Sequence, residues 1–169
     1  MELEERLAEL ERRVAELEGA GRAVRPDGAR ADGDFWALDG LTAKLAADGA
    51  GDGGVLFTGT VRLPAGERYE WQQALGTDAL LAGDWPAAAE SFAALGHPVR
   101  LRLLREILGG RRTAAELTEL PGLGTTGQVY HHLRQLAAAG WLHTTGRGRH
   151  EVPPGRVVPL LVALLASRP

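Results

Sequence analysis

Apolar side chains recur within residues 1–19 at alternating spacings of four and three residues, which is the a/d pattern of a coiled coil. They are Leu3, Leu7, Leu10, Val14 and Leu17. The flanking g and e positions hold arginine and glutamate, so two parallel copies of this helix would pair Arg6 with Glu11 and Arg13 with Glu18. The pattern predicts a coiled-coil helix that joins two copies of the chain, and a helix packed on its own domain is the alternative.

The alternating spacing of apolar residues ends after residue 19. Residues 20–33 combine glycine, proline and mixed charge, which predicts a linker. A small α+β region is expected over residues 34–92. It contains an amphipathic helix over 35–47, and a second helix, which runs from a cap at Asp84 to Leu95, begins within it.

Between these two helices the sequence predicts a β-hairpin. Two runs rich in β-branched and aromatic residues, 55–63 and 67–75, flank a Pro-Ala-Gly turn. Gly59 is expected to mark a β-bulge. The candidate packing residues are Val55, Phe57, Val61 and Leu63. The aromatic side chains of residues 34–92 are expected either to line an effector pocket or to form the core of a small dimerisation unit.

The pattern is denser over residues 93–169. Helices are expected over 98–108, over a short segment that opens with a capping box, and over 125–140. A β-hairpin with a basic Gly-Arg-Gly tip follows over 141–152, and the chain ends in an apolar helix. This is the layout of a winged helix-turn-helix, so the expected fold class is mainly α with a small β content.

Charge is segregated along the chain. The net charge is −3, but residues 1–95 hold 9 basic and 18 acidic side chains, whereas residues 96–150 hold 8 basic and 3 acidic ones. This asymmetry indicates a nucleic-acid partner for the basic part. The absence of cysteine excludes disulfides and thiolate metal sites. No apolar run is long enough to cross a bilayer and no secretory signal opens the chain, so the expected compartment is the cytoplasm.

Residues 93–167 resemble the DNA-binding domain of ArsR-type bacterial transcriptional regulators. The resemblance rests on ALGHPVRLRLLREIL, TAAELTEL, TTGQVYHHLRQLAAAGWL and the wing TTGRGRHEV. It implies a homodimer that reads a palindromic operator, with repression as the expected mode. It also implies a C-terminal helix that contributes to dimerisation, for which the candidate residues are Leu160, Leu161 and Leu164.

The helix over 125–140 is the expected recognition helix. With Val129 turned inward, Leu133 and Leu136 fall on the same side, and polar residues face outward. Gln128 could address adenine or a phosphate, and the first-turn amides and the wing arginines suit phosphates or the adjacent minor groove. The candidate DNA-binding residues are Thr113, Thr125, Thr126, Gly127, Gln128, Tyr130, His131, Arg134, Arg147 and Arg149.

Other side chains have plainer interpretations. Thr113 is foremost a helix cap, His132 is expected to pack at the core edge, and Arg100 is expected to be solvated. His143 and His150 could meet across the wing, but two ligands fall short of a tetrahedral metal site, so no metal and no cofactor are expected. The chain has no P-loop, G-x-S-x-G or H-E-x-x-H motif, so no enzyme is expected.

The sequence thus predicts a homodimeric, DNA-binding transcriptional regulator. The alternative is an interaction or assembly module, in which the coiled coil and the hairpin drive oligomerisation and DNA binding is nonspecific or absent. In either case residues 34–92 could serve a small-molecule effector or a protein partner.

Overall fold

The computed structural model describes Arg6, residues 35–49 and residues 51–168. The chain divides into two units, Met1–Trp36 and Ala37–Pro169, and the second is described below. The predicted linker over 20–33 and the predicted coiled coil lie outside the described residues. The latter prediction concerns Leu3, Leu7, Leu10, Val14 and Leu17.

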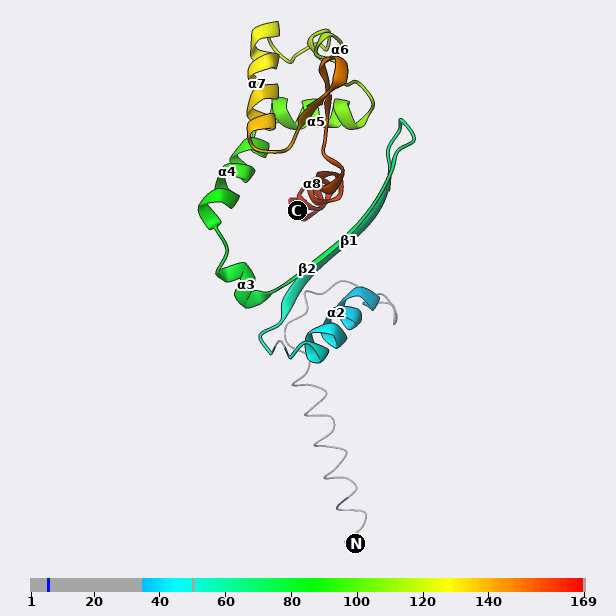
Figure 1. Ribbon diagram of the computed structural model, residues 1–169, viewed down its shortest axis with the longest axis vertical. Coiled ribbons are helices and arrows are strands. Elements are labelled where there is room, and N and C mark those ends of the chain that lie inside the picture. Colours follow the sequence, from blue (N-terminus) through cyan, green and yellow to red (C-terminus); the bar gives the residue numbers. More distant parts are fainter. Residues whose placement is uncertain (1–5, 7–34, 50, 169) are drawn as a thin grey trace. The chain divides into compact units, whose positions relative to one another are not determined.

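The second unit is mostly helical and contains two small antiparallel sheets (Figure 1). Its elements are α2 (Trp36–Ala47), β1 (Gly54–Arg62), β2 (Arg68–Gly76), α3 (Thr77–Leu81), α4 (Trp85–Leu95), α5 (Pro98–Leu108), α6 (Ala114–Thr118), α7 (Thr126–Ala138), β3 (His143–Thr145), the 3-10 turn η1 (Gly146–Gly148), β4 (Arg149–Glu151) and α8 (Pro154–Ala166). The helices α5, α6 and α7 and the β3–β4 wing confirm the predicted winged helix and the predicted α+β fold class.

Local sequence decides where the helices begin. Asp84 caps α4 by accepting a backbone hydrogen bond, and a proline follows in the first turn. At the start of α5, His97 Nδ1 accepts a hydrogen bond from the Val99 N–H at 3.2 Å. Thr113 and Glu116 form the predicted capping box at the start of α6.

The core lies where α5, α6, α7 and α8 meet the wing and the end of the first hairpin. Its almost fully buried side chains are Leu103, Leu104, Ile107, Leu117, Leu123, Val129, Leu133, Leu136, Val157 and Leu160. Leu63 from the hairpin turn and Trp141 from the start of the wing join the same cluster. The hairpin therefore packs on the helix-turn-helix part. The predicted domain boundary between residues 92 and 93 stays a prediction.

The β1–β2 hairpin follows the predicted pairing but not the predicted bulge. The two strands pair in unbroken register, and Gly59 lies directly opposite Trp71. The expectation of a bulge at Gly59 is wrong. Glycine is needed there because a Cβ atom would lie 2.7 Å from Val158 Cγ1 of α8, which is too close for any side chain.

Most of the predicted packing residues of the hairpin do face the core. Leu63 is buried, Val61 packs against the core and Phe57 is half-buried. Val55 is 58% exposed, so the expectation that it packs is wrong. It lies at the end of β1 remote from Leu63, beyond the part of the hairpin that joins the core.

Helix α8 is buried on two sides by its own chain. Leu160 is 1% exposed within the core, and Val158 faces Gly59 of the hairpin. The assignment of Leu160 to a dimer interface is therefore wrong, because the hairpin and the core supply the cover expected from a second subunit. Leu161 is half-buried against the core, and Leu164 is 39% exposed. Among the described residues, no helix is long and apolar enough to cross a membrane.

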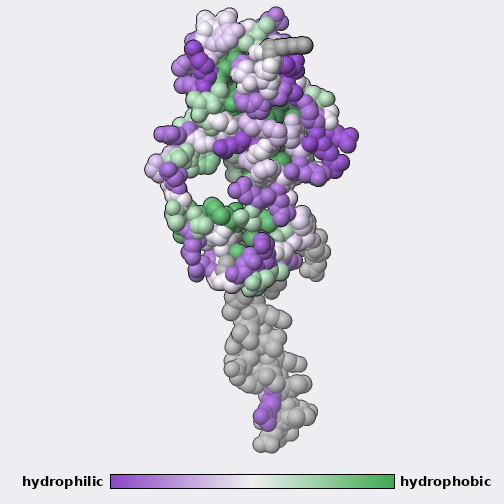
Figure 2. Space-filling view, viewed as in Figure 1, coloured by the Kyte–Doolittle hydropathy of each residue, from purple (hydrophilic) through white to green (hydrophobic). Residues whose placement is uncertain are grey.

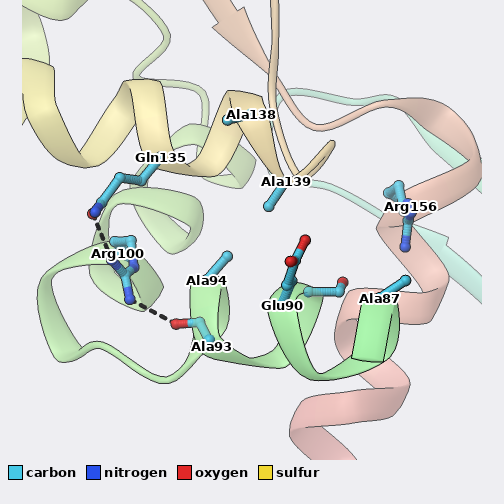
Figure 3. A pocket seen from close by; sticks show the side chains of 10 residues that line it. Ala87, Glu90, Ala93, Ala94, Arg100, Gln135, Ala138, Ala139 and Arg156 are labelled. Carbon is cyan, nitrogen blue, oxygen red and sulfur yellow. Dashed lines mark hydrogen bonds between the residues drawn. The ribbon is translucent and has the colours of Figure 1, made fainter. Parts of the chain in front are cut away.

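An arginine ties α4, α5 and α7 together. Arg100 on α5 donates hydrogen bonds to Gln135 Oε1 at 2.6 Å and to the Ala93 carbonyl oxygen at 2.7 Å, and both bonds are drawn in Figure 3. The side chain is therefore a link between helices and not the solvated group that the sequence suggests. It borders a pocket of about 600 Å³ that Glu90 and Arg156 also line.

Candidate nucleic-acid interface

Helix α7 turns one face to the core and the other to solvent. Val129, Leu133 and Leu136 are buried, as the helical periodicity predicts. The predicted recognition residues Thr126, Gly127, Tyr130, His131 and Arg134 are all exposed. This face is therefore polar and open, and an arginine and an imidazole on it can donate hydrogen bonds to base edges or phosphates.

The first turn of α7 is held by its own side chains. Thr125 Oγ1 accepts a hydrogen bond from the Gln128 N–H at 3.3 Å, and Gln128 Oε1 accepts one from the Thr125 N–H at 2.7 Å. This reciprocal pair is a capping box. The Thr-x-x-Gln spacing is a sequence signature of that motif, so this role of Gln128 was within reach of sequence analysis.

The capping box changes what the first turn can offer to DNA. The amide oxygen of Gln128 is already engaged, whereas its role as a reader of adenine needs both ends of the side-chain amide. The N–H groups of Thr126 and Gly127 open the helix and have no intrahelical acceptor. A Cβ atom at Gly127 would meet no atom within 4 Å, so the backbone there is open to a close approach.

The wing is a hairpin of two three-residue strands, and the segment before α6 pairs with its second strand. Beside the β3–β4 pairing, Thr113 forms an antiparallel bridge with Arg149, and the His150 N–H donates to the Arg112 carbonyl oxygen at 2.7 Å. The predicted contact residues Arg147 and Arg149 lie in η1 and at the start of β4. The structure thus brings Thr113, the cap of α6, next to a wing arginine.

Three imidazoles gather at the edge of α7. The ring centroid of His132 lies 4.5 Å from that of His97 and 5.7 Å from that of His131. Burial, and then electrostatic interactions with His97, Arg100 and His131, lower the pKa of His132 below its ordinary value. His132 is half-buried, which agrees with the expected packing role, whereas His131 remains on the exposed face.

The two wing histidines do not face each other. His143 lies opposite Glu151 and His150 lies opposite Thr144, so the two imidazoles project from opposite faces of the small sheet. The suggested meeting of His143 and His150 is therefore wrong. Within the part of the chain that the structure describes, no three His, Cys, Asp or Glu side chains are placed to hold a metal ion.

The aromatic residues of the 34–92 region do not gather in one place. Trp36, Trp71 and Trp85 are each at least 40% exposed, and Tyr69 packs against the core. Phe57 and Phe92 border a groove of about 740 Å³ between α4, α8 and β1. Figure 2 shows hydrophobic side chains beside the opening between the α3–α4 segment and the hairpin.

Arg112 has a structural role that no sequence motif indicates. Its guanidinium pairs with Glu67 at the end of the hairpin turn and with Glu151 of β4, at 3.3 Å from Glu151 Oε1. These partners are 45 and 39 residues away in the chain, so no local pattern reveals them. Arg112 therefore joins the first hairpin to the wing.

Residues 95–144 match a family model described as a helix-turn-helix domain. The matched segment runs from the end of α4 into β3 and contains the whole of α5, α6 and α7. No curated protein and no solved structure matches the chain significantly. This part of the chain is thus a helix-turn-helix domain, which implies DNA as the partner and transcription regulation as the role.

Proposed function

We propose that this protein is a sequence-specific transcriptional regulator of the ArsR type that binds DNA through α7 and the wing. The observation that carries the proposal is the exposed face of α7, which lies within the matched helix-turn-helix segment. Helices in this position of the motif enter the major groove and read base edges. In this proposal His131 and Arg134 contact DNA, and the amides of Thr126 and Gly127 hold a phosphate.

The wing supplies the second contact. Arg147 and Arg149 lie at or beside its tip and meet the phosphates or the minor groove next to the site read by α7. These contacts position the domain without reading sequence. Repression follows when the bound site overlaps a promoter, and this is the mode that the resemblance to ArsR-type regulators favours.

Selection of bound sequences from a random DNA pool, at near-physiological salt, tests the proposal. The expected result is an enriched sequence, with its base preference relaxed in His131→Ala and its affinity lowered by about 1–3 kcal/mol in Arg134→Ala. Arg105→Ala is the matched control, because Arg105 is an exposed arginine on α5, outside the proposed interface. Recovery of no enriched sequence by the full-length protein would overturn the proposal.

We further propose that the protein acts as a homodimer through α4 and the end of α8. Large apolar side chains on these helices are exposed, among them Trp85 and Phe92 of α4 and Leu164 and Leu165 of α8. A groove of about 740 Å³ lies beside them, and Phe92 itself borders it together with alanine and serine residues of α4 and α8. A surface that carries exposed apolar side chains beside a groove suits a two-fold interface, in which each copy places apolar side chains in the groove of the other.

Analytical ultracentrifugation tests this interface. Phe92→Ser is expected to weaken self-association at least about tenfold, since buried aromatic anchors dominate interfaces. Leu38→Ser is the matched control, because Leu38 is an exposed apolar residue of α2. Arg6→Glu combined with Arg13→Glu tests the predicted coiled coil separately. A Phe92→Ser protein that associates like the wild type would contradict the α4–α8 interface.

A dimer of this kind makes a prediction about DNA. Two recognition helices related by a two-fold axis require two half-sites about 34–36 Å apart, which is one turn of the double helix. The selected sequence is therefore expected to be a palindrome with that spacing. A single, non-palindromic half-site would indicate a monomer on DNA.

A further inference from the structure

One guanidinium joins three segments of the chain. Arg112 precedes α6, and its side chain is only 15% exposed. It donates hydrogen bonds to Glu67, which ends the turn between β1 and β2, and to Glu151, which ends β4. A single arginine therefore bridges a carboxylate of the first hairpin and a carboxylate of the wing.

The backbone on either side of this bridge completes the wing. The Arg112 carbonyl oxygen accepts the hydrogen bond from the His150 N–H, and the next residue, Thr113, pairs with Arg149. The wing strands are only three residues long, and a two-stranded hairpin of that length is marginal by itself. The position of the wing thus depends on the segment that carries Arg112.

Electrostatics hold the bridge in its charged form. Burial alone would lower the pKa of Arg112, but its hydrogen bond and attraction to Glu67, and the attraction of Glu151, raise the pKa above its ordinary value. A hydrogen bond from its own backbone N–H and then the bond from Arg112 lower the pKa of Glu67. Arg112 and Glu67 therefore both remain ionised near neutral pH.

The hairpin end of the bridge is fixed by packing. Leu63, at the other side of the turn, is buried in the common core, and its N–H and carbonyl oxygen bond to residues 67 and 66 of the turn. Leu63, Arg112 and Glu151 border the same small cavity. The backbone of Glu67 is therefore bound to the buried Leu63 independently of Arg112, so Glu67 can anchor the Arg112 side chain.

We propose that the β1–β2 hairpin positions the wing for DNA through the Glu67–Arg112–Glu151 bridge. Glu67 and Arg112 are then positioning residues, which act on DNA through the wing arginines. This inference rests on the proposed function for its DNA part, and it gives the hairpin, which lies outside the matched helix-turn-helix segment, a role in binding.

Hydrogen exchange in the free protein tests the bridge itself. Glu67→Gln is expected to increase amide exchange in the wing, above all at His150, by about tenfold, which equals about 1.4 kcal/mol of opening free energy. Glu70→Gln is the matched control. It removes the same charge three residues further along the same hairpin, but Glu70 pairs with Arg68 in an exposed ion pair instead of with Arg112.

DNA affinity as a function of salt tests the positioning role. Glu67→Gln should bind the selected DNA about tenfold more weakly than Glu70→Gln, with a salt slope lower by about one, because a wing phosphate contact is lost. Both variants remove one negative charge, so the general electrostatic attraction to DNA rises equally in both. This effect therefore cancels when the two affinities are compared. Arg112→Lys keeps the charge but cannot span two carboxylates, and it should show the same losses.

The outcomes separate the two claims. Equal wing exchange in Glu67→Gln and Glu70→Gln would overturn the bridge as the support of the wing. Faster wing exchange with unchanged affinity and salt slope would overturn its role in DNA binding. A wild-type protein that selects no DNA sequence would overturn the proposed function, while the exchange comparison would still decide whether the hairpin holds the wing.

Discussion

Addition of one methyl group at Gly127 separates the stability of the recognition helix from its fit to DNA. Gly127 is the second residue of α7, and its φ angle is not positive, so alanine can adopt its conformation. A Cβ atom there would meet no other atom within 4 Å. In the free protein, Gly127→Ala therefore adds a methyl group to open space.

The expected magnitudes have opposite signs. A glycine-to-alanine change at a compatible helix position stabilises a protein by about 0.4–1 kcal/mol, because the unfolded chain loses freedom. For a chain of this length that raises Tm by about 1–4 °C. If the first turn of α7 lies against DNA, the same methyl group keeps the backbone from its phosphate, and affinity should fall about tenfold, or about 1.4 kcal/mol.

The assay pairs thermal unfolding with fluorescence anisotropy on the selected DNA. Gly40→Ala is the matched control, since Gly40 lies inside α2 and a Cβ atom there also meets nothing within 4 Å. It should raise Tm and leave DNA affinity unchanged. Equal DNA affinity of Gly127→Ala and the wild type would mean that the first turn of α7 does not approach DNA closely.

Three further predictions concern the stability of the fold. Gly59→Ala should lower stability to urea by about 1–3 kcal/mol, because its Cβ atom would lie 2.7 Å from Val158 Cγ1, and Val158→Ala in the same chain should recover part of the loss; additive effects would contradict this contact. Thr125→Ala should cost about 1 kcal/mol by removing the cap of α7, and an unchanged thermal midpoint would refute that role. Folding lowers the pKa of His132 below 6.5. The contribution of neutral His132 to stability is therefore complete above pH 6.5, and it is lost as the pH falls through the pKa of the folded state. Urea midpoints between pH 7.5 and 5 should therefore fall less in His132→Gln than in the wild type, and identical profiles would exclude this histidine as a source.

The elements that sequence analysis located are those whose limits are set by neighbouring residues. Asp84 begins α4 and the Thr113–Glu116 capping box begins α6, as their side chains predict. The wing turns at Gly146–Gly148, where the sequence has glycine on both sides of an arginine. These features depend on interactions within a few residues, so the local sequence is enough to predict them.

The features that sequence analysis missed depend on contacts between distant segments. A glycine within a strand signals either a bulge or a close approach, and only the packing of Val158 on Gly59 decides between them. Leu160 is apolar on an apolar helix, and nothing local shows that its own chain covers it. Arg112 finds Glu67 across 45 residues, so its role depends on the fold and not on a motif.

If α7 reads DNA sequence, the protein binds its selected DNA far more tightly than DNA of unrelated sequence, and the ratio of these two affinities measures the effect. Anisotropy titrations at physiological salt would compare the full-length protein on its selected DNA and on a scrambled duplex of the same length and composition. We expect at least about 10³-fold tighter binding to the selected DNA, as sequence-specific regulators show. A ratio near one, with binding that falls steeply with salt, would mean that the domain holds only the phosphate backbone and would contradict sequence reading by α7.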